Sequence, residues 1–525
     1  MNQKIKHKAL WLALAVLATQ ACTEDFEGLN RNSKHLSDQG LTYDANEGGF
    51  LLPAMMNNII SVTTGGVQTQ QNLQADSYAG YLEPPGEFTS NVNTLTYVTK
   101  GSPWTGSWTV TTNNTMNNWV QMYKNNIAEK YPDLYAIALI CKVFGGHRLV
   151  DTFGPYPYEE YGLTAEPKFN TPEECYELFF QDLDWAVDAL KAAEAADPNA
   201  DQVRFARWDQ STFRGEYTLW LKAANTLRLR LAIRISAVNP TLGEAEAMKA
   251  INPDNGGLLD ETTGPFGMFA PNGHPYVEMR DAWSDTRMSA AIITYMDGFG
   301  DPRLSAYATQ ATDPKIAGEY RGIRPGGKHP DKTLYADFSM PNFSLSDPLK
   351  VMDGAESYFL RAEGALRGWN MGGTAQELYE QGIRASFELN GVSGADEYLQ
   401  STSTMLPYVD PEQPSYNAPV LSDVTVKWDE SADFETKLEK ISTQKWITMW
   451  PEGTEGWSEI RRTGYPKQYH IMEPNNPLLP LGTFIKRLTY PIAQVVTSTP
   501  AGYAQAVSYL GRDDEDVTFF WMKED

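Results

Sequence analysis

Apolar residues that recur every three or four positions constrain the fold of this chain more than any other feature. Residues 171–196 show the pattern most clearly: Thr171 can cap a helix, Pro172 takes the first helical position, and acids fill the first turn. The apolar positions that follow are Tyr176, Phe179, Phe180, Leu183, Val187 and Leu190. This spacing predicts a long amphipathic helix, which must bury its apolar face against another element.

The same spacing predicts further helices, and short turns join several of them into pairs. We therefore expect a mainly α fold built from tetratricopeptide-like helix pairs, although the 34-residue repeat of such proteins is not legible in the sequence. The predicted helical segments are residues 117–151, divided near Pro132; 213–238, ending before Asn239 and Pro240; 354–369 and 374–391, joined by a Gly-rich turn; and 434–450, ended by Pro451.

The stretches between these helices are rich in Thr, Asn, Gly, Pro and Asp, which favour turns and loops. No clean linker separates them, so we expect one composite domain over residues 51–525. Loops that a rigid scaffold carries are common places for binding sites, and a loop-rich ligand face is therefore expected. The predicted loop stretches are residues 60–115, 251–350, 392–430 and 463–525.

The N-terminal segment has the features of a secretory signal. Lysines precede an apolar run at residues 9–18, and Ala21 precedes Cys22. The run is shorter than the roughly 20 apolar residues that span a bilayer, and no later stretch qualifies. The segment resembles a bacterial lipoprotein signal, which implies removal of residues 1–21, acylation of Cys22 and a polar tether over residues 22–50. Ordinary secretion with cleavage elsewhere is the alternative.

Charge excludes two classes of partner. The formal net charge is −24, and removing three lysines with residues 1–21 gives 40 − 67 = −27. Such acidity disfavours binding to nucleic acid or to anionic lipid through a basic patch. Export would permit a disulfide between Cys141 and Cys175, but both lie in apolar helical segments, so we expect buried free thiols.

A search for catalytic motifs finds none. The histidines form no close metal pair, and the sequence contains no G-x-S-x-G, Walker or G-x-G-x-x-G motif. Acid pairs are too frequent in this chain to argue for a glycosidase. We therefore expect no enzyme and no cofactor. Residues 252–261 have oxygen ligands at short spacing, as a calcium loop would, but their Asn-Pro and Asn-Gly pairs also simply favour turns.

Aromatic residues in the loop stretches are the candidates for ligand binding. A sugar ring can stack on an aromatic face while its hydroxyl groups bond to nearby polar side chains. The alternative is that these rings pack loops onto the helices. The candidate ligand-binding residues are Tyr78, Tyr81, Tyr97, Trp104, Trp108, Tyr276, Arg280, Trp283 and Asp285.

Other prominent residues are expected to serve the scaffold. Tryptophans at helical spacing are interpreted as core: Trp119, Trp185, Trp220, Trp369 and Trp446. Arg228, Arg230 and Arg234 alternate with apolar residues inside one helix, and we expect them to pair with acids.

Several segments in chain order resemble the SusD/RagB family of nutrient-binding outer-membrane lipoproteins of Bacteroidetes. The start at Cys22 is similar to that of the second SusD-like branch. The segments are CTEDFEGLNRNS (22–33), DTFGPYPYEEYG (151–162), WLKAANTLRLRLAIRIS (220–236), GDPRL (300–304), YFLRAEGALRGW (358–369) and ISTQKWITMWPEGTEGWSEIRRTGYP (441–466).

The resemblance implies a lipid-anchored protein on the outer face of the outer membrane. Such proteins act as a lid over a SusC-like TonB-dependent transporter and capture an oligosaccharide, or in some cases a peptide, without chemistry. Glu24, Asp25 and Glu27 would then form an export signal, or else only keep the tether solvated. The family's ligand-binding residues vary, so the resemblance assigns none here. A peptide-binding lid and, more remotely, a surface glycosidase are the alternatives.

Overall fold

The structure is a computed structural model that describes residues 45–86, 96–99, 105–196, 206–327, 329, 331–472 and 475–523. Contacts divide the chain into two units, residues 1–47 and 48–525, and the second contains the folded elements considered below. The predicted signal, Cys22, most of the predicted tether and Trp104 lie outside the described residues. The end of the predicted tether includes helix α4 (Asn46–Gly49).

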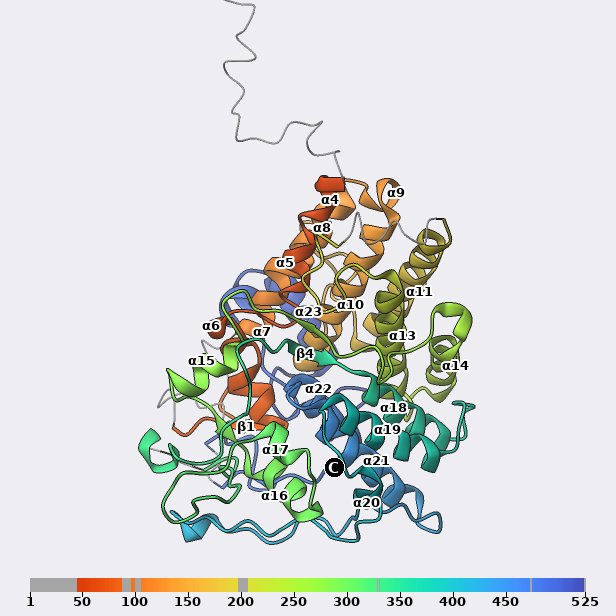
Figure 1. Cartoon of the computed structure of the whole chain (residues 1–525). Coiled ribbons are helices and arrows are strands. Elements are labelled where there is room, and N and C mark those ends of the chain that lie inside the picture. Colours follow the sequence, from red (N-terminus) through yellow and green to blue (C-terminus); the bar gives the residue numbers. More distant parts are fainter. Residues whose placement is uncertain are drawn as a thin grey trace, which may run out of the picture. The chain divides into compact units, whose positions relative to one another are not determined.

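Helix pairs form the scaffold, as the sequence predicts (Figure 1). Within a pair the two helices pack on each other, and successive pairs also touch: α11 contacts α13, α13 contacts α18, and α18 contacts α21. The pairs are α10 (Pro132–Phe153) with α11 (Pro172–Ala196), α13 (Tyr217–Arg234) with α14 (Pro240–Ile251), α18 (Gly354–Leu366) with α19 (Ala375–Leu389), and α21 (Phe434–Met449) with α22 (Gly453–Thr463).

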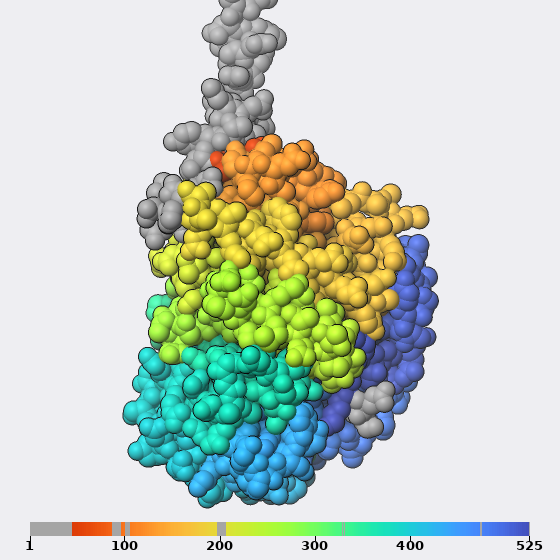
Figure 2. All heavy atoms as spheres, turned by 90° about the vertical axis from the view of Figure 1, so that its right-hand side faces the viewer, coloured from red at the N-terminus to blue at the C-terminus, as the bar shows by residue number. Residues whose placement is uncertain are grey.

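The stacking of these pairs follows the chain. On the face shown in Figure 2, the colours change in order from orange through yellow, green and teal to light blue. Neighbouring bands therefore belong to successive parts of the sequence. Among the helices in the described ranges, none is both long enough and apolar enough to cross a membrane.

Local sequence explains where the long helices begin. The Thr171 hydroxyl accepts from the Glu174 N–H at 3.2 Å, and the Glu174 carboxylate accepts from the Thr171 N–H at 3.0 Å. Thr374 and Glu377 form the same reciprocal arrangement at the start of α19. Each such capping box satisfies N–H groups that have no partner within the helix.

Prolines that look like helix ends turn out to begin helices. Residues 117–151 form three helices rather than two, because Asn126 (φ 53°) adds a break between α8 and α9 before Pro132 starts α10. The Asn239 side chain accepts from the Leu242 N–H at 3.2 Å, so Asn239-Pro240 caps a helix that the sequence analysis missed. Likewise α22 follows Pro451. The two short helices are α8 (Asn117–Lys124) and α9 (Ile127–Lys130).

The predicted loop stretches contain many short helices, which corrects that expectation. Short polar helices depend on tertiary packing, so their sequences carry little apolar periodicity. The elements outside the pairs are α5 (Leu52–Met56), α6 (Thr64–Val67), α7 (Gly106–Val110), α15 (Pro275–Asp281), α16 (Ala290–Phe299), α17 (Leu304–Tyr307), α20 (Ala395–Tyr398) and α23 (Pro500–Leu510); the π-helical segments η2 (Gln68–Asp76), η4 (Thr111–Met116) and η8 (Ile492–Thr497); and the 3₁₀ turns η5 (Pro253–Asn255), η6 (Lys332–Tyr335) and η7 (Pro414–Tyr416).

Two small antiparallel sheets hold distant loops together. Strand β1 (Leu82–Glu83) pairs with β3 (Arg287–Met288), and β2 (Phe266–Met268) pairs with β4 (Leu349–Met352). A register shift lies between Phe266 and Gly267, where an added Cβ would collide with the backbone of β4. Glycine therefore permits the close approach of the two strands.

Buried ion pairs join the helix pairs, as predicted for the arginines of α13. Arg228 donates to Glu246 at 2.5 Å, Arg230 donates to Glu356 at 2.6 and 2.7 Å, and Arg234 pairs with Glu455. All three guanidinium groups are almost fully buried, so their carboxylate partners are needed to offset desolvation.

The remaining core predictions hold with one exception. Cys141 and Cys175 are buried free thiols, and four of the five tryptophans assigned to the core are buried. Trp185 is the exception, with 39% of its surface exposed. It lies on α11, where its ring and that of Tyr135 meet edge to face at a centroid distance of 5.2 Å.

Candidate functional site

Tyr78 and Tyr97, two of the candidate residues, pack against each other inside the fold. Their ring centroids are 5.6 Å apart in an edge-to-face arrangement, and Tyr78 also lies 5.1 Å from Trp457. The outer edge of Tyr97 meets Phe484. Burial raises the pKa of both phenols well above the ordinary value, so both hydroxyls stay neutral.

Tyr81 and Trp108 belong to two further aromatic clusters. Tyr81 stacks on Trp446 at 5.3 Å and donates its hydroxyl hydrogen to the Trp446 carbonyl at 2.5 Å. Trp108 contacts Phe153 and Tyr156 edge to face, at 5.4 and 5.3 Å. Both clusters fix short N-terminal helices onto the scaffold.

Tyr276 takes part in a buried polar cluster with η2. Its hydroxyl donates to Asp76, which also accepts from the Gln71 side chain at 2.8 Å. Burial raises the pKa of Asp76 to about 7, against the lowering effect of these hydrogen bonds. A carboxyl group with this pKa titrates near neutrality although no solvent reaches it.

Arg280 lies in the last turn of α15, and Trp283 and Asp285 lie in the loop that follows it. The Asp285 carboxylate is buried, accepts from the Gln68 side chain at 3.0 Å and pairs with Lys332. Arg280 donates to the carbonyls of Pro341 and Phe343 at 2.9 and 3.1 Å. Trp283 keeps 37% of its surface exposed.

The structure corrects the expectation that most candidate rings lie on an exposed loop face. A buried ring has no face free for a sugar, and six candidates are between 0 and 6% exposed: Tyr78, Tyr81, Tyr97, Trp108, Tyr276 and Asp285. They pack inside the fold rather than on one surface, and ring contacts through Trp450 and Phe343 join Tyr81 to Tyr276. Trp283 is the one candidate tryptophan that the described residues leave accessible, with Arg280 close to it in sequence.

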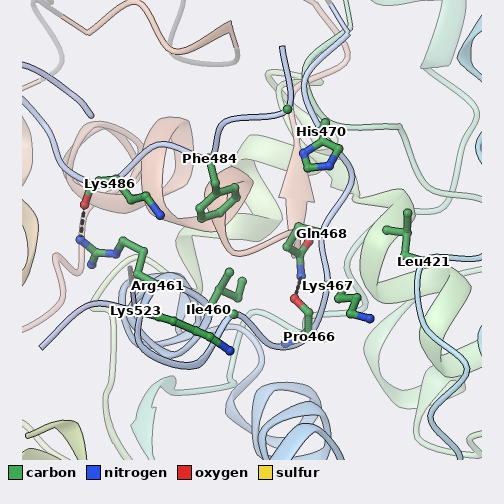
Figure 3. Close-up of a pocket in the computed structure, with 12 residues that line it drawn as sticks. Leu421, Ile460, Arg461, Pro466, Lys467, Gln468, His470, Phe484, Lys486 and Lys523 are labelled. Carbon is green, nitrogen blue, oxygen red and sulfur yellow. Dashed lines mark hydrogen bonds between the residues drawn. The ribbon is translucent and has the colours of Figure 1, made fainter. Parts of the chain in front are cut away.

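A pocket that the sequence analysis missed opens beside the end of α22 (Figure 3). Its volume is about 490 Å³, which lies within the range of ordinary small-ligand sites. One part of the wall is apolar and consists of Leu421, Ile460, Pro466 and Phe484. The other part is basic and consists of Arg461, Lys467, His470, Lys486 and Lys523, with Gln468 beside them.

The basic residues reach the pocket in different ways. In Figure 3 the Arg461 guanidinium turns toward the backbone of Lys486, whose carbonyl accepts at 2.7 Å. The Lys523 ammonium donates to the Thr463 carbonyl at 3.2 Å and lies 3.3 Å from Glu435. Lys467 and His470 are exposed. Phe484 lies between Lys486 and Gln468 in this view.

The signal for this pocket was weak in the sequence. Residues 461–470 hold four basic side chains in an acidic chain, but Lys486 and Lys523 join them only through the fold. Nothing in periodicity or motif spacing predicts that these three segments meet.

Residues 252–261, which have oxygen ligands at short spacing as a calcium loop would, contain a structured turn. The Asn252 side chain accepts from the Asp254 N–H at 3.0 Å, and Asp260 pairs with Lys222 at 2.9 Å. In the part of the chain that the structure describes, no three His, Cys, Asp or Glu residues group as metal ligands. Calcium binding here stays a prediction.

The fold is a scaffold of stacked helix pairs with a pocket beside α22, and similarity to known proteins identifies its family. The sequence matches the SusD-like family, described as SusD and RagB outer membrane lipoproteins, over residues 28–523. This chain therefore belongs to the SusD-like family. Among curated proteins, no relative matches this sequence.

Solved structures agree with this assignment. A chitin-binding SusD homologue from Flavobacterium johnsoniae is 38% identical with a TM-score of 0.85, covering 91% of this chain and 99% of that one. A SusD-like protein from Bacteroides thetaiotaomicron is 32% identical with a TM-score of 0.83 and the same coverage. A SusD homologue from Bacteroides vulgatus is 33% identical with a TM-score of 0.82, covering 88% and 94%.

Proposed function

We propose that this protein is a lipid-anchored, cell-surface lipoprotein that binds an oligosaccharide and delivers it to a SusC-like TonB-dependent transporter without catalysis. The observation that carries the proposal is the similarity to a chitin-binding SusD homologue over nearly the whole of both chains. Membership of an outer membrane lipoprotein family supports the location. The lipid anchor would be attached at Cys22.

Glycan binding is tested with the mature chain, in which Cys22 is replaced so that the protein is free of lipid. Calorimetry against chito-oligosaccharides, other neutral oligosaccharides and short peptides should show saturable heat with a glycan. Heat with peptides alone would favour the peptide-binding lid instead. The appearance of shorter glycans after incubation would favour a glycosidase and contradict the proposal.

The exposed ring of Trp283 is the residue to test first. Stacking of a sugar on an aromatic face contributes about 1 kcal/mol, so Trp283→Ala should weaken glycan binding about fivefold or more. Trp185→Ala is a matched control, because Trp185 is exposed to a similar extent but lies on α11 of the scaffold. Equal binding by the wild type and both variants would exclude Trp283 from the site. Trp104→Ala tests the other exposed-loop prediction in the same way.

The anchor and the partner need separate tests. Cys22→Ala should move the protein from the membrane fraction to the soluble fraction of its host, and retention in the membrane would contradict lipidation. The wild-type lipoprotein, extracted in mild detergent, should co-purify with a TonB-dependent barrel. Purification without such a barrel would contradict the delivery step while leaving glycan binding intact.

A further inference from the structure

We propose that the pocket beside α22 binds the anionic group of an acidic sugar, a ring carboxylate or a sulfate ester, and so selects acidic glycans. The inference rests on the proposed function and adds to it a site and a substrate class. It starts from the contrast between the pocket and the rest of the molecule. The chain has 67 Asp and Glu against 43 Lys and Arg, yet four of the 12 residues that line this pocket are Lys or Arg and a fifth is His470.

No acidic side chain is among the described residues that form the pocket wall. The Lys523 ammonium lies 3.3 Å from the carboxylate of Glu435, which is exposed. A single solvated carboxylate screens one cation only weakly. The positive charge of the exposed Lys467 and Lys523 is therefore available to an incoming anion, whereas an acidic surface repels one.

Arg461 supplies fixed positive charge behind the wall. Its guanidinium lies 3.6 Å from the Trp457 ring centroid, and its donors reach the Asp151 carbonyl at 2.6 Å and the Ser458 hydroxyl at 2.9 Å. These hydrogen-bond partners are neutral, whereas the nearby Asp151 and Glu455 carboxylates offset part of its charge. Burial lowers the pKa of Arg461 to about 9, which still leaves the group charged at neutral pH.

Lys467 and Lys523 supply exposed positive charge to the pocket wall. Both are exposed, and a lysine ammonium acts as a compact point charge with no fixed fork geometry. Lysine side chains can therefore pair with an anion of either shape, a planar carboxylate or a tetrahedral sulfate. The pocket should therefore recognise the charge of the substituent more than its geometry.

The apolar part of the wall favours a sugar ring as the carrier of the anion. Phe484 is half-buried and presents its ring to the cavity, and Pro466 and Ile460 continue the apolar surface. The C–H face of a pyranose can pack on such a surface while its substituent meets the lysines. A free inorganic anion would leave this surface unused, and the cavity volume of about 490 Å³ accommodates more than one small ion.

The test compares sugars that differ in charge. Calorimetry of the mature chain uses a neutral chito-oligosaccharide, a uronate trisaccharide, a sulfated disaccharide and inorganic sulfate, at low and at physiological salt. We expect an acidic sugar to bind at least about tenfold more tightly than the neutral one, and the difference to shrink with salt because salt screens exposed charges. Comparison of the uronate with the sulfated sugar distinguishes the two sources of anion.

Variants locate the binding site. Lys467→Gln and Lys523→Gln should each weaken acidic-sugar binding by about fivefold and leave the neutral sugar unchanged. Phe484→Ala should weaken the acidic sugar but not inorganic sulfate. Lys427→Gln is the matched control, since Lys427 is an exposed lysine away from the pocket wall. Thermal melting of each variant confirms that it is folded.

Four results would overturn the inference. If neutral sugars bind as tightly as acidic ones, or if Lys427→Gln weakens binding as much as Lys467→Gln, the pocket does not select anionic sugars, although the proposed function stands. If acidic peptides bind and no glycan does, both fail. If inorganic sulfate binds but no sugar does, the pocket is an adventitious ion site only.

Discussion

The ion pair between Glu363 and Arg462 provides the sharpest test of how the scaffold is held together. It joins α18 to α22, the helix whose end forms one side of the basic pocket. The two guanidinium nitrogens of Arg462 donate to the two carboxylate oxygens of Glu363, both at 2.6 Å. Arg462 also donates to Glu459 at 2.7 Å, and both ends of the main pair are about 98% buried.

The size of the expected loss of stability follows from the burial of this ion pair. Glu363→Gln keeps the shape of the side chain but leaves Arg462 with only one of its two carboxylates, and removing one partner of a buried pair costs about 3–5 kcal/mol. An unfolding entropy of about 2.1 cal/mol/K per residue gives the 48–525 unit about 1 kcal/mol/K. The variant should therefore melt about 3–5 °C below the wild type.

The assay is a double-mutant cycle followed by differential scanning calorimetry. Arg462→Met removes the charge that Glu363→Gln leaves unpaired. Glu459, the other partner of Arg462, still has its ion pair with Lys445 at 2.9 Å. The double variant should therefore lose less stability than the sum of the single variants, by about 1.5–3 kcal/mol. Lys315→Gln, which breaks an exposed pair with Glu412, should cost less than about 1 kcal/mol. A coupling energy near zero would refute the reasoning.

Three other predictions address buried groups. Burial raises the pKa of Asp76 to about 7, so the folded state holds this proton more tightly than the unfolded chain, and its contribution to stability is lost as pH rises from about 4 to 7. A shift of about three pKa units corresponds to about 4 kcal/mol of stability. The melting temperature of Asp76→Asn should therefore change less between pH 5 and pH 8 than that of the wild type. An equal change in melting temperature would contradict the raised pKa of Asp76. Burial favours the neutral form of the Glu459 carboxyl group, but the positive charges of Arg462 and Lys445 outweigh this effect. They hold the pKa of Glu459 well below its usual range. Stability should accordingly fall as pH drops below about 4.5, and Glu459→Gln should flatten that fall in acid-unfolding curves. Cys141 and Cys175 are fully buried, so a thiol reagent should label neither in the folded protein and both in urea; labelling of neither in urea would indicate a disulfide.

The scaffold could be predicted from sequence because its helices bury one face. α11 shows apolar residues at threes and fours and a Thr171 cap, and the structure places it within two residues of the prediction. The arginines of α13 were also predictable, since a buried guanidinium needs a carboxylate. α14 and α22 were missed because a proline that looks like a helix end stands at the start of each: Pro240 is the first residue of α14, and Pro451 comes just before the Glu452 cap of α22.

The candidate site was less predictable for a physical reason. Tyr81 and Trp283 both lie in polar, turn-rich sequence, yet one is fully buried on Trp446 and the other is exposed. Composition cannot separate these cases, because exposure depends on contacts between residues hundreds of positions apart. The basic pocket shows the same limit, since Lys486 and Lys523 join residues 461–470 only after folding.

The central claim is that this member of the SusD-like family binds a glycan and leaves it intact. Calorimetric titration of the mature wild-type chain with neutral and acidic oligosaccharides, followed by mass spectrometry of the recovered sugars, tests it most directly. We predict saturable heat with at least one oligosaccharide and recovery of that oligosaccharide at its original length. No heat with any glycan, or shortened products, would contradict the claim.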